Sequence, residues 1–182
     1  MSLIAGNLSA IQRILDGDQI EWAVCAGAAA HLYGTRRPIR DVDILVAPGA
    51  LAAIARLLNQ QQKTVQFDGR RILWRGIELI DDLSVRRNGM IFPLTFDPPM
   101  RERLRRMPLL GAPVAVQPPE DVVLHKLLLD RGAAEGKHDH DDALGIVRRQ
   151  QLDAAYLKRR MQLMRFEATA ALAAIGVVLS DS

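Results

Sequence analysis

Cysteine is nearly absent from this chain, and long hydrophobic runs are missing altogether. Cys25 is the single cysteine among 182 residues, so no disulfide can form within the chain, and a disulfide-held fold is excluded. No apolar run reaches the roughly 18 residues of a membrane span. The first residues also lack a basic region followed by a long apolar stretch, so no secretory signal is predicted. These features favour a soluble protein of a reducing compartment, and we expect it in the cytoplasm with no membrane partner.

Lysine is scarce as well, because 20 of the 24 basic residues are arginine. Arginine suits bidentate recognition of phosphate and carboxylate groups. Three clusters are evident: Arg36, Arg37 and Arg40; Arg70, Arg71 and Arg75 with Arg86 and Arg87; and Arg101, Arg103, Arg105 and Arg106. A solvated surface is the simpler interpretation of the last two clusters. We expect Arg37 and Arg40 to bind an anion, because they flank an acidic pair.

The length and the 49% hydrophobic content suit one well-packed domain with an appendage. Hydrophobic patterning and turn signals predict a mixed, twisted β-sheet backed by helices, an α/β (α+β) fold. Helices are expected at 8–16 (capped by Asn7 or Ser9), 50–59, 101–106, 122–129, 143–149 and 153–174. Strands are expected at 20–25, 42–47, 65–67, 71–74 and 76–83, with a strand pair over 110–116 and a two-residue turn at Asp68-Gly69. Residues 1–117 would form the α/β core, with 118–182 as a C-terminal helical region packed on it.

Asp41 and Asp43 form an acidic pair at the start of the predicted strand 42–47. Side chains at i and i+2 of a strand share one face and lie roughly 6.5 Å apart along the backbone. Two like charges at the mouth of a core strand repel each other unless a cation neutralises them, and oxygen ligands suit Mg²⁺. The pair therefore predicts a divalent-metal site, with a solvated Asp-x-Asp turn as the alternative.

The turn after the first strand is built from small residues, Ala26-Gly27-Ala28-Ala29-Ala30. Small residues let a phosphate chain approach the backbone closely. We expect Gly27, with Ala28 beside it, to lie against a nucleotide phosphate. A tight strand-to-helix turn packed with alanines is the competing interpretation for the alanines.

The segment from the first strand to the acidic pair resembles the DNA polymerase β-like nucleotidyltransferases. The resemblance consists of a strand, the glycine turn, the Leu32-Tyr33-Gly34 helix end, an arginine, and Asp-x-Asp before a hydrophobic run. The likeness is to the small prokaryotic, minimal (AbiEii-like) members. The resemblance covers about residues 20–147. It implies a nucleotidyltransferase fold with a C-terminal helical extension, and Mg²⁺-dependent (or Mn²⁺-dependent) transfer of an NMP from an NTP. Two residues depart from the family pattern. Ala26 replaces the usual first glycine of the turn, and Ile39 replaces the usual hydroxyl residue two positions before the first aspartate.

A site of this kind needs a third carboxylate from a neighbouring strand, as metal ligand and acceptor of the hydroxyl proton. Glu78 is the first choice, since it alone is flanked by hydrophobic residues as in the family. Asp82 is the second choice and would share the face of Glu78 if the strand stays regular, whereas Asp81 would point the other way. An edge-strand charge that discourages aggregation is the alternative role for Glu78.

A second stretch, from Pro119-Glu120-Asp121 to Asp142, also resembles these nucleotidyltransferases, with Lys126, Lys137 and Asp139 matching the family pattern. Lys126 falls on a mostly apolar helix, where an unpaired ammonium would be costly. It should therefore reach either the NTP phosphate or Asp142. The tract His138-Asp139-His140-Asp141-Asp142 could instead hold a metal of its own, as in a phosphohydrolase, or cap a helix.

Three functions remain open on the sequence. An enzyme would use Asp41, Asp43 and Glu78 as metal ligands, with Gly27, Ala28, Arg37, Arg40 and Lys126 on the nucleotide. A catalytically inactive binding protein of the same fold, or the toxin of a toxin-antitoxin pair, are the alternatives. The acceptor could be a small molecule, tRNA or a protein, and a homodimer or an antitoxin partner is conceivable.

Overall fold

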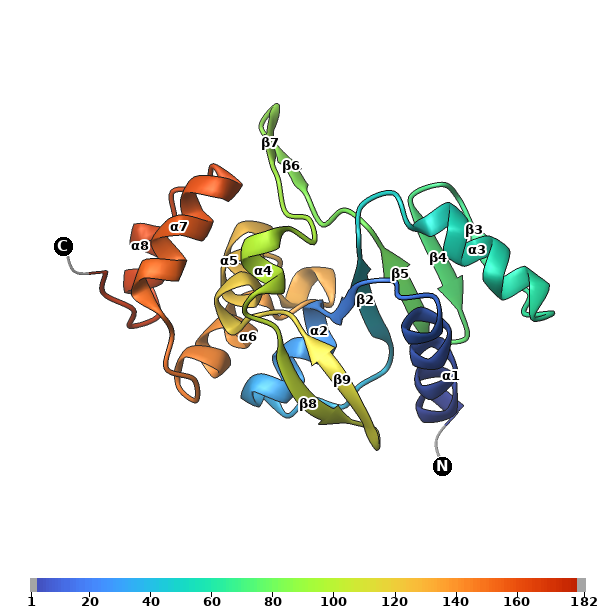
Figure 1. The fold of residues 1–182 in the computed structure, drawn as a ribbon. Coiled ribbons are helices and arrows are strands. Elements are labelled where there is room, and N and C mark those ends of the chain that lie inside the picture. The colour runs from blue at the N-terminus through green and yellow to red at the C-terminus, as the bar shows by residue number, and fades with distance from the viewer. Residues whose placement is uncertain (1–2, 180–182) are drawn as a thin grey trace.

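A seven-stranded mixed sheet forms the centre of the molecule, and the computed structural model describes residues 3–179 (Figure 1). The strands run in the order β3-β4-β5-β2-β1-β9-β8, and a separate hairpin is formed by β6 and β7. The strands are β1 (Trp22–Val24), β2 (Val42–Val46), β3 (Gln66–Phe67), β4 (Arg71–Trp74), β5 (Ile77–Ile80), β6 (Val85–Arg87), β7 (Met90–Phe92), β8 (Arg105–Leu109) and β9 (Ala112–Val116). The α-helices are α1 (Leu3–Gly17), α2 (Ala26–Ala30), α3 (Leu51–Gln60), α4 (Pro98–Arg101), α5 (Pro119–Leu129), α6 (Asp139–Val147), α7 (Ala154–Met164) and α8 (Thr169–Ala174), with a π-helical turn at His31–Thr35 and a 3-10 turn at Ala133–Glu135.

Parallel and antiparallel pairs are combined in the sheet. β2 runs parallel to β5 and β1 parallel to β9, while the other neighbours are antiparallel. The central strand β2 is apolar after Asp43, and its Ile44, Leu45 and Val46 are fully buried. Such a near-continuous apolar strand is what burial on both faces requires. The predicted mixed sheet backed by helices is confirmed.

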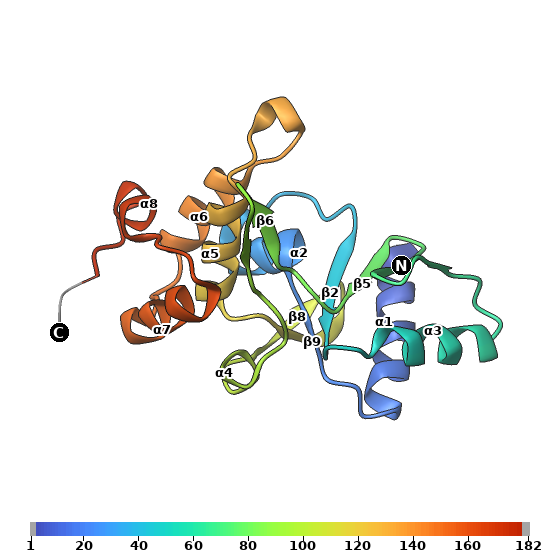
Figure 2. The same ribbon diagram turned by 90° about the horizontal axis from the view of Figure 1, so that it is seen from above.

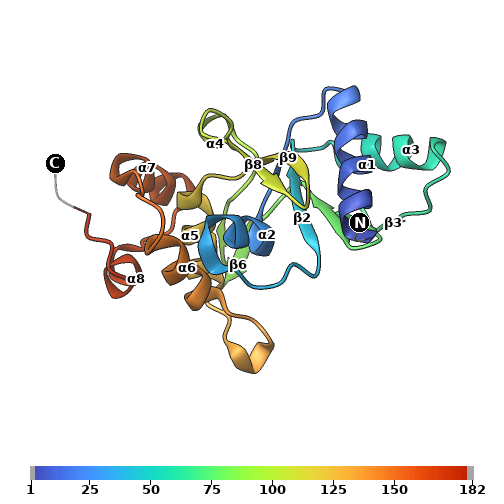
Figure 3. The ribbon, with the colours of Figure 1, turned by 90° about the horizontal axis from the view of Figure 1, so that it is seen from below.

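The two faces of the β3-β4-β5 part of the sheet differ in character. Ile72, Trp74, Ile77 and Leu79 are buried on one face, where α1 contacts β5 and α3 contacts β4. On the opposite face, cross-strand register places Gln66, Leu73, Glu78 and Asp43 in one row. Figures 2 and 3 show α1 and α3 together at one end of the molecule and α7 and α8 at the other. This row faces away from α1 and α3, and its Asp43 and Glu78 line a cavity beside α2, α5 and α6.

The first helix was predicted too short. α1 begins at Leu3 and contains Asn7 and Ser9, so neither residue caps it. The Asn7 amide is buried and donates a hydrogen bond to the carbonyl of Arg75 (2.9 Å), and the Ser9 hydroxyl donates to the carbonyl of Ala5. The partner of Asn7 thus lies far away in the sequence, whereas Ser9 bonds to the preceding turn of its own helix.

The predicted helix over 101–106 is also wrong. α4 ends at Arg101, and Arg105 and Arg106 belong to β8, the last strand of the sheet on that side. Pro108 in this strand suggested a break, but an edge strand tolerates proline because one side of its backbone needs no partner. The helix expected at 153–174 is interrupted as well, since Arg165 adopts a left-handed conformation (φ 53°) between α7 and α8.

The hairpin signals of the sequence were incomplete. The β3-β4 connection is longer than the predicted two-residue turn, because β3 ends at Phe67 and β4 begins at Arg71. Within it, the Asp68 carboxylate accepts hydrogen bonds from the backbone of Arg70 and Arg71 (2.9 Å each). The β6-β7 hairpin was not anticipated. Over residues 3–179, no helix is long and apolar enough to cross a bilayer.

Candidate active site

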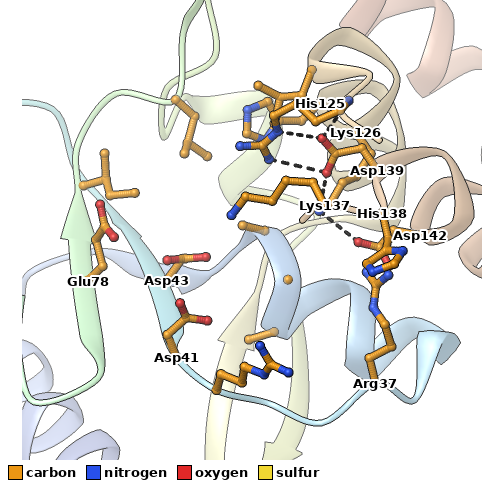
Figure 4. A pocket seen from close by; sticks show the side chains of 18 of the residues that line it. Arg37, Asp41, Asp43, Glu78, His125, Lys126, Lys137, His138, Asp139 and Asp142 are labelled. Carbon is orange, nitrogen blue, oxygen red and sulfur yellow. Dashed lines mark hydrogen bonds and ion pairs between the residues drawn. The ribbon is translucent and has the colours of Figure 1, made fainter. Parts of the chain in front are cut away.

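A cavity of about 640 Å³ opens between the sheet and helices α2, α5 and α6. Carboxylates stand on one wall: Asp41 precedes β2, Asp43 lies on it, and Glu78 lies on β5. Figure 4 shows Asp43 and Glu78 on neighbouring strands with Asp41 beside Asp43, and Lys126 and Lys137 across the cavity from them. The residues that the sequence assigned to a metal and to a nucleotide all line this cavity.

Asp43 and Glu78 are directly opposed in the parallel β2-β5 register, and Asp41 lies two residues before Asp43. Burial, together with the nearby charges of Asp41 and Glu78, raises the pKa of Asp43 to about 6. The three carboxylates therefore repel one another. An all-oxygen donor set of this kind fits a hard cation such as Mg²⁺.

Glu78 is partly engaged by another group. Its Oε1 accepts a hydrogen bond from Arg71 Nη1 at 3.2 Å, within an exposed ion pair. Within residues 3–179, no three His, Cys, Asp or Glu side chains gather closely enough to hold a metal ion. The carboxylates therefore share a wall without forming a closed three-ligand group.

The alternative acids occupy other positions. β5 ends at Ile80, so the predicted strand position of Asp82 is wrong. Asp82 still lines the cavity, and its carboxylate accepts a hydrogen bond from the backbone of Ser84 at 2.7 Å. The Asp81 carboxylate instead accepts from the backbone of Gly49 at 2.9 Å.

Gly27 and Ala28 lie at the start of α2, on the floor of the same cavity. A Cβ atom built on Gly27 meets no atom within 4 Å, so the space above this glycine is open. The turn is tied to the acidic strand, because the backbone N–H of Cys25 donates to the carbonyl of Asp43 (2.9 Å). A ligand lying against Gly27 would therefore be close to the strand that carries Asp43.

Most cations of the cavity already hold carboxylate partners. Lys126 Nζ lies 2.8 Å from an oxygen of Asp139 and 2.9 Å from one of Asp142, and both aspartates are buried. Arg37 also pairs with Asp142, and Arg131 pairs with Asp139 at 2.8 Å. Burial opposes ionisation of Asp139, but its bonds to Arg131 and Lys126 prevail and lower its pKa.

The tract 138–142 thus supplies these two ion-pair partners through Asp139 and Asp142. His125 lies beside them and is buried, which lowers its pKa to about 4 and keeps it neutral at pH 7. The expected anion for Lys126 is therefore a pair of aspartates within the chain.

Lys137 was missed as a site residue. It is exposed, lines the cavity, and its charge offsets part of the rise in the pKa of Asp43. Among the described cations of this cavity, Lys137 and Arg40 form no ion pair. The sequence shows Lys137 only as part of a helix-start pattern, and its position over the acidic strand depends on the loop after α5.

Comparison with known proteins yields structural likeness alone. No family model and no curated protein sequence matches the chain. The solution structure of the antibiotic-resistance factor ANT(2'')-Ia matches with a TM-score of 0.58 and 12% identity, over 94% of each chain. The chain has the nucleotidyltransferase fold.

Two further structures share this nucleotidyltransferase fold. The lincosamide antibiotic adenylyltransferase LnuA, solved with lincomycin, has a TM-score of 0.51 and 12% identity, over 79% of this chain and 96% of that one. An antigenic nucleotidyltransferase-like protein from Paracoccidioides brasiliensis has a TM-score of 0.50 and 18% identity, over 94% and 91% of the two chains. ANT(2'')-Ia has also been crystallised with adenylyl-2''-tobramycin. The nucleotidyltransferase fold predicted from the motifs is thus confirmed at the level of architecture.

Proposed function

We propose that this protein is a nucleotidyltransferase that moves an NMP from an NTP to the hydroxyl of an acceptor. One observation carries the proposal: a single cavity places three carboxylates on one wall and six cationic side chains around them. The cations are Arg37, Arg40, Arg71, Lys126, Arg131 and Lys137. A metal-bound triphosphate needs both kinds of group, because carboxylates hold the cation and basic side chains neutralise the phosphates.

Asp41 and Asp43 would hold the divalent cation, with Glu78 as the third ligand. Mg²⁺ or Mn²⁺ bound there would offset the negative charge that develops on the reacting phosphate. Gly27 and Ala28 would lie against the phosphate chain, since the space above Gly27 is open. Arg40 and Lys137 would neutralise the triphosphate directly because they form no ion pair within the described residues.

Arg37 and Lys126 would contribute positive charge to the nucleotide site while remaining paired with an aspartate. The Arg37 guanidinium and the Lys126 ammonium both pair with Asp142, and both residues line the cavity. Their positive charges would therefore lie at fixed positions beside the nucleotide. We further propose that the α/β core, residues 1–117, supplies the carboxylates, and that the helical region 118–182 supplies Lys126 and Lys137. The two regions would then complete one site.

In the reaction, the acceptor oxygen forms a bond to the α-phosphorus while the bond from that phosphorus to the bridging oxygen breaks. Pyrophosphate leaves with the electron pair, and the hydroxyl proton passes to a carboxylate, for which Glu78 is placed on the cavity wall. The protein contributes mainly positioning and charge neutralisation.

Calorimetry of α,β-methylene-ATP, with the corresponding GTP, CTP and UTP analogues, tests the proposal in the presence of Mg²⁺. At least one analogue should bind to the wild-type protein, and Asp43→Asn should weaken its binding by tenfold or more. Asp141→Asn is the matched control, because Asp141 is exposed and does not line the cavity. Equal affinity in the wild type and Asp43→Asn would refute the metal-dependent assignment.

A noncatalytic nucleotide-binding role is the second candidate. The open arrangement of the three carboxylates favours it, as do Ala26 and Ile39 at positions where the resemblance implies other residues. Such a protein would bind nucleotide equally well with and without Mg²⁺. Calorimetry repeated in EDTA therefore separates the two functions.

A further inference from the structure

A second cavity, of about 500 Å³, adjoins the first and shares two of its acidic residues. Asp41 and Glu78 line both cavities, so these carboxylates stand between them. The remaining wall is formed by the end of β4, the turn into β5, and the segment before β3. Its principal side chains are Thr64, Val65, Gln66, Leu73, Trp74 and Arg75.

The two cavities differ in charge. The first contains six cations, whereas Arg75 is the one cation among the described residues that line the second. Apart from the shared Asp41 and Glu78, that lining contains no acid. Its other side chains are apolar or neutral, and they include Val65, Leu73, Trp74 and Gln66.

The geometry of phosphoryl transfer gives this second cavity a role. The attacking and leaving oxygens lie roughly in line on opposite sides of the phosphorus. If the triphosphate extends toward the cation-rich wall near Lys137, the acceptor must approach from the far side of the carboxylates. The second cavity lies beside those carboxylates and lacks the cations that polyphosphate requires.

The wall of the second cavity is braced by contacts with α1 and by cations beside Trp74. The Asn7 amide on α1 binds the carbonyl of Arg75 at 2.9 Å. Gly76 follows with φ +83°, and a Cβ there would lie 3.3 Å from Ile4, so the turn is tightly packed. The guanidinium of Arg75 and the ammonium of Lys63 lie 6.0 and 5.6 Å from the centre of the Trp74 ring. A braced wall lowers the ordering cost of binding a small molecule.

We propose that the second cavity binds the acceptor, and that the acceptor is an uncharged, hydroxyl-bearing small molecule with an apolar ring or chain. The volume of the second cavity, about 500 Å³, lies in the range of small-molecule binding sites. A polycationic acceptor is disfavoured, because the cavity offers it no acid beyond the two carboxylates assigned to the metal, and Arg75 repels it. The inference rests on the proposed function and adds the class of acceptor.

Methyl NMR of the full chain, in the presence of Mg²⁺ and α,β-methylene-ATP, tests the proposal with two probes. Phenyl β-D-glucopyranoside is an uncharged hydroxyl compound with an apolar ring, and tobramycin is a polycation. The glucoside should shift the methyl signals of Leu73 and Val65 more than those of Val85 and Leu129, which line the first cavity. Tobramycin should leave Leu73 and Val65 unshifted.

Other outcomes would overturn the assignment. These are glucoside shifts confined to Val85 and Leu129, shifts of Leu73 by tobramycin, or no response of Leu73 to the glucoside. Two variants add a second measurement. Leu73→Asp should weaken glucoside binding at least fivefold, while Leu73→Met should keep it within twofold.

The same experiment without nucleotide separates this inference from the proposed function. Glucoside binding at Leu73 in a protein that binds no nucleotide analogue would refute the transferase and leave the second cavity as a small-molecule site with no acceptor role. Nucleotide binding near Lys137 without any response at Leu73 would support the proposed function and refute the acceptor site in the second cavity.

Discussion

Asp43 and Glu78 lie directly opposite each other on the parallel strands β2 and β5, with Asp41 two residues before Asp43. Sequence separation hides this relationship, because the two acids are 35 positions apart and their pairing depends on a crossover through α3 and the β3-β4 hairpin. The register brings three negative charges to one cavity wall. Burial, together with the charges of Asp41 and Glu78, raises the pKa of Asp43 to about 6. The same clustering of negative charge destabilises the metal-free fold and would favour the binding of a cation.

Asp43→Asn should stabilise the metal-free protein at pH 7. Burial and neighbouring carboxylates raise the folded-state pKa of Asp43 from 3.8 to about 6, so the folded state binds the proton more tightly than the unfolded chain. The wild type should therefore lose stability as pH rises through about 4 to 6, by about 1–3 kcal/mol. Urea unfolding in EDTA at pH 4 and pH 7 measures this, and a variant with an unchanged pH dependence would contradict the assignment.

Gly27→Ala should fold normally and bind nucleotide about tenfold more weakly. The added methyl meets no protein atom within 4 Å, so it enters the space proposed for the phosphate chain. Gly17→Ala at the end of α1 is the matched control, since it is equally open and lies outside the cavity. Calorimetry with the best nucleotide analogue compares the two, and equal affinities would remove Gly27 from the site.

Lys137→Ala should lower nucleotide affinity about tenfold while changing the free energy of unfolding by less than about 0.5 kcal/mol, as expected for an exposed side chain. Its ammonium forms no ion pair among the described residues, so phosphate is its natural partner. Lys158→Ala, on α7, is a control outside the cavity. A Lys137 variant that binds nucleotide as the wild type does would return the phosphate role to the remaining cations.

Lys126→Ala should behave differently from Lys137→Ala. Its removal leaves the buried Asp139 and Asp142 with less compensation, which in comparable buried pairs costs about 3–5 kcal/mol. Arg131 and Arg37 remain as partners, so we expect a loss of about 2–3 kcal/mol in urea unfolding, together with weaker nucleotide binding. An unchanged free energy of unfolding would show that the ion pairs contribute nothing to the fold.

Arg160→Met should destabilise the protein by about 3 kcal/mol or more. Arg160 is buried on α7 and pairs with Asp121 and Asp97, each at 2.5 Å. Burial raises the pKa of Asp121 to about 6 despite the opposing charge of Arg160. In the variant, Asp121 should be protonated at neutral pH. Thermal unfolding at pH 5 and pH 8 should show a larger deficit at the higher pH, and equal deficits would contradict this reasoning.

Local chemistry explains what could be predicted from the sequence. Apolar continuity after Asp43 identified the central strand, and the spacing of Asp41 and Asp43 placed both acids on one face. The small-residue turn at Gly27 and the proline-acid start of α5 were equally local signals. These features depend on neighbouring residues, so a single sequence carries them.

Long-range pairing explains what could not be predicted. Asn7 and Arg75 meet across 68 positions, so the polar side chain looked like a helix cap. Lys126 faces two aspartates, where the pattern allowed a phosphate or Asp142. The unpaired state of Lys137 follows only from knowing which acids the other cations already hold.

A crystal structure with α,β-methylene-ATP and Mn²⁺ tests the central claim most directly. We predict an anomalous manganese peak in contact with Asp41 and Asp43, and a triphosphate that passes Gly27 toward Lys137. Nucleotide bound outside this cavity, or bound within it with no manganese at the two aspartates, would contradict the account.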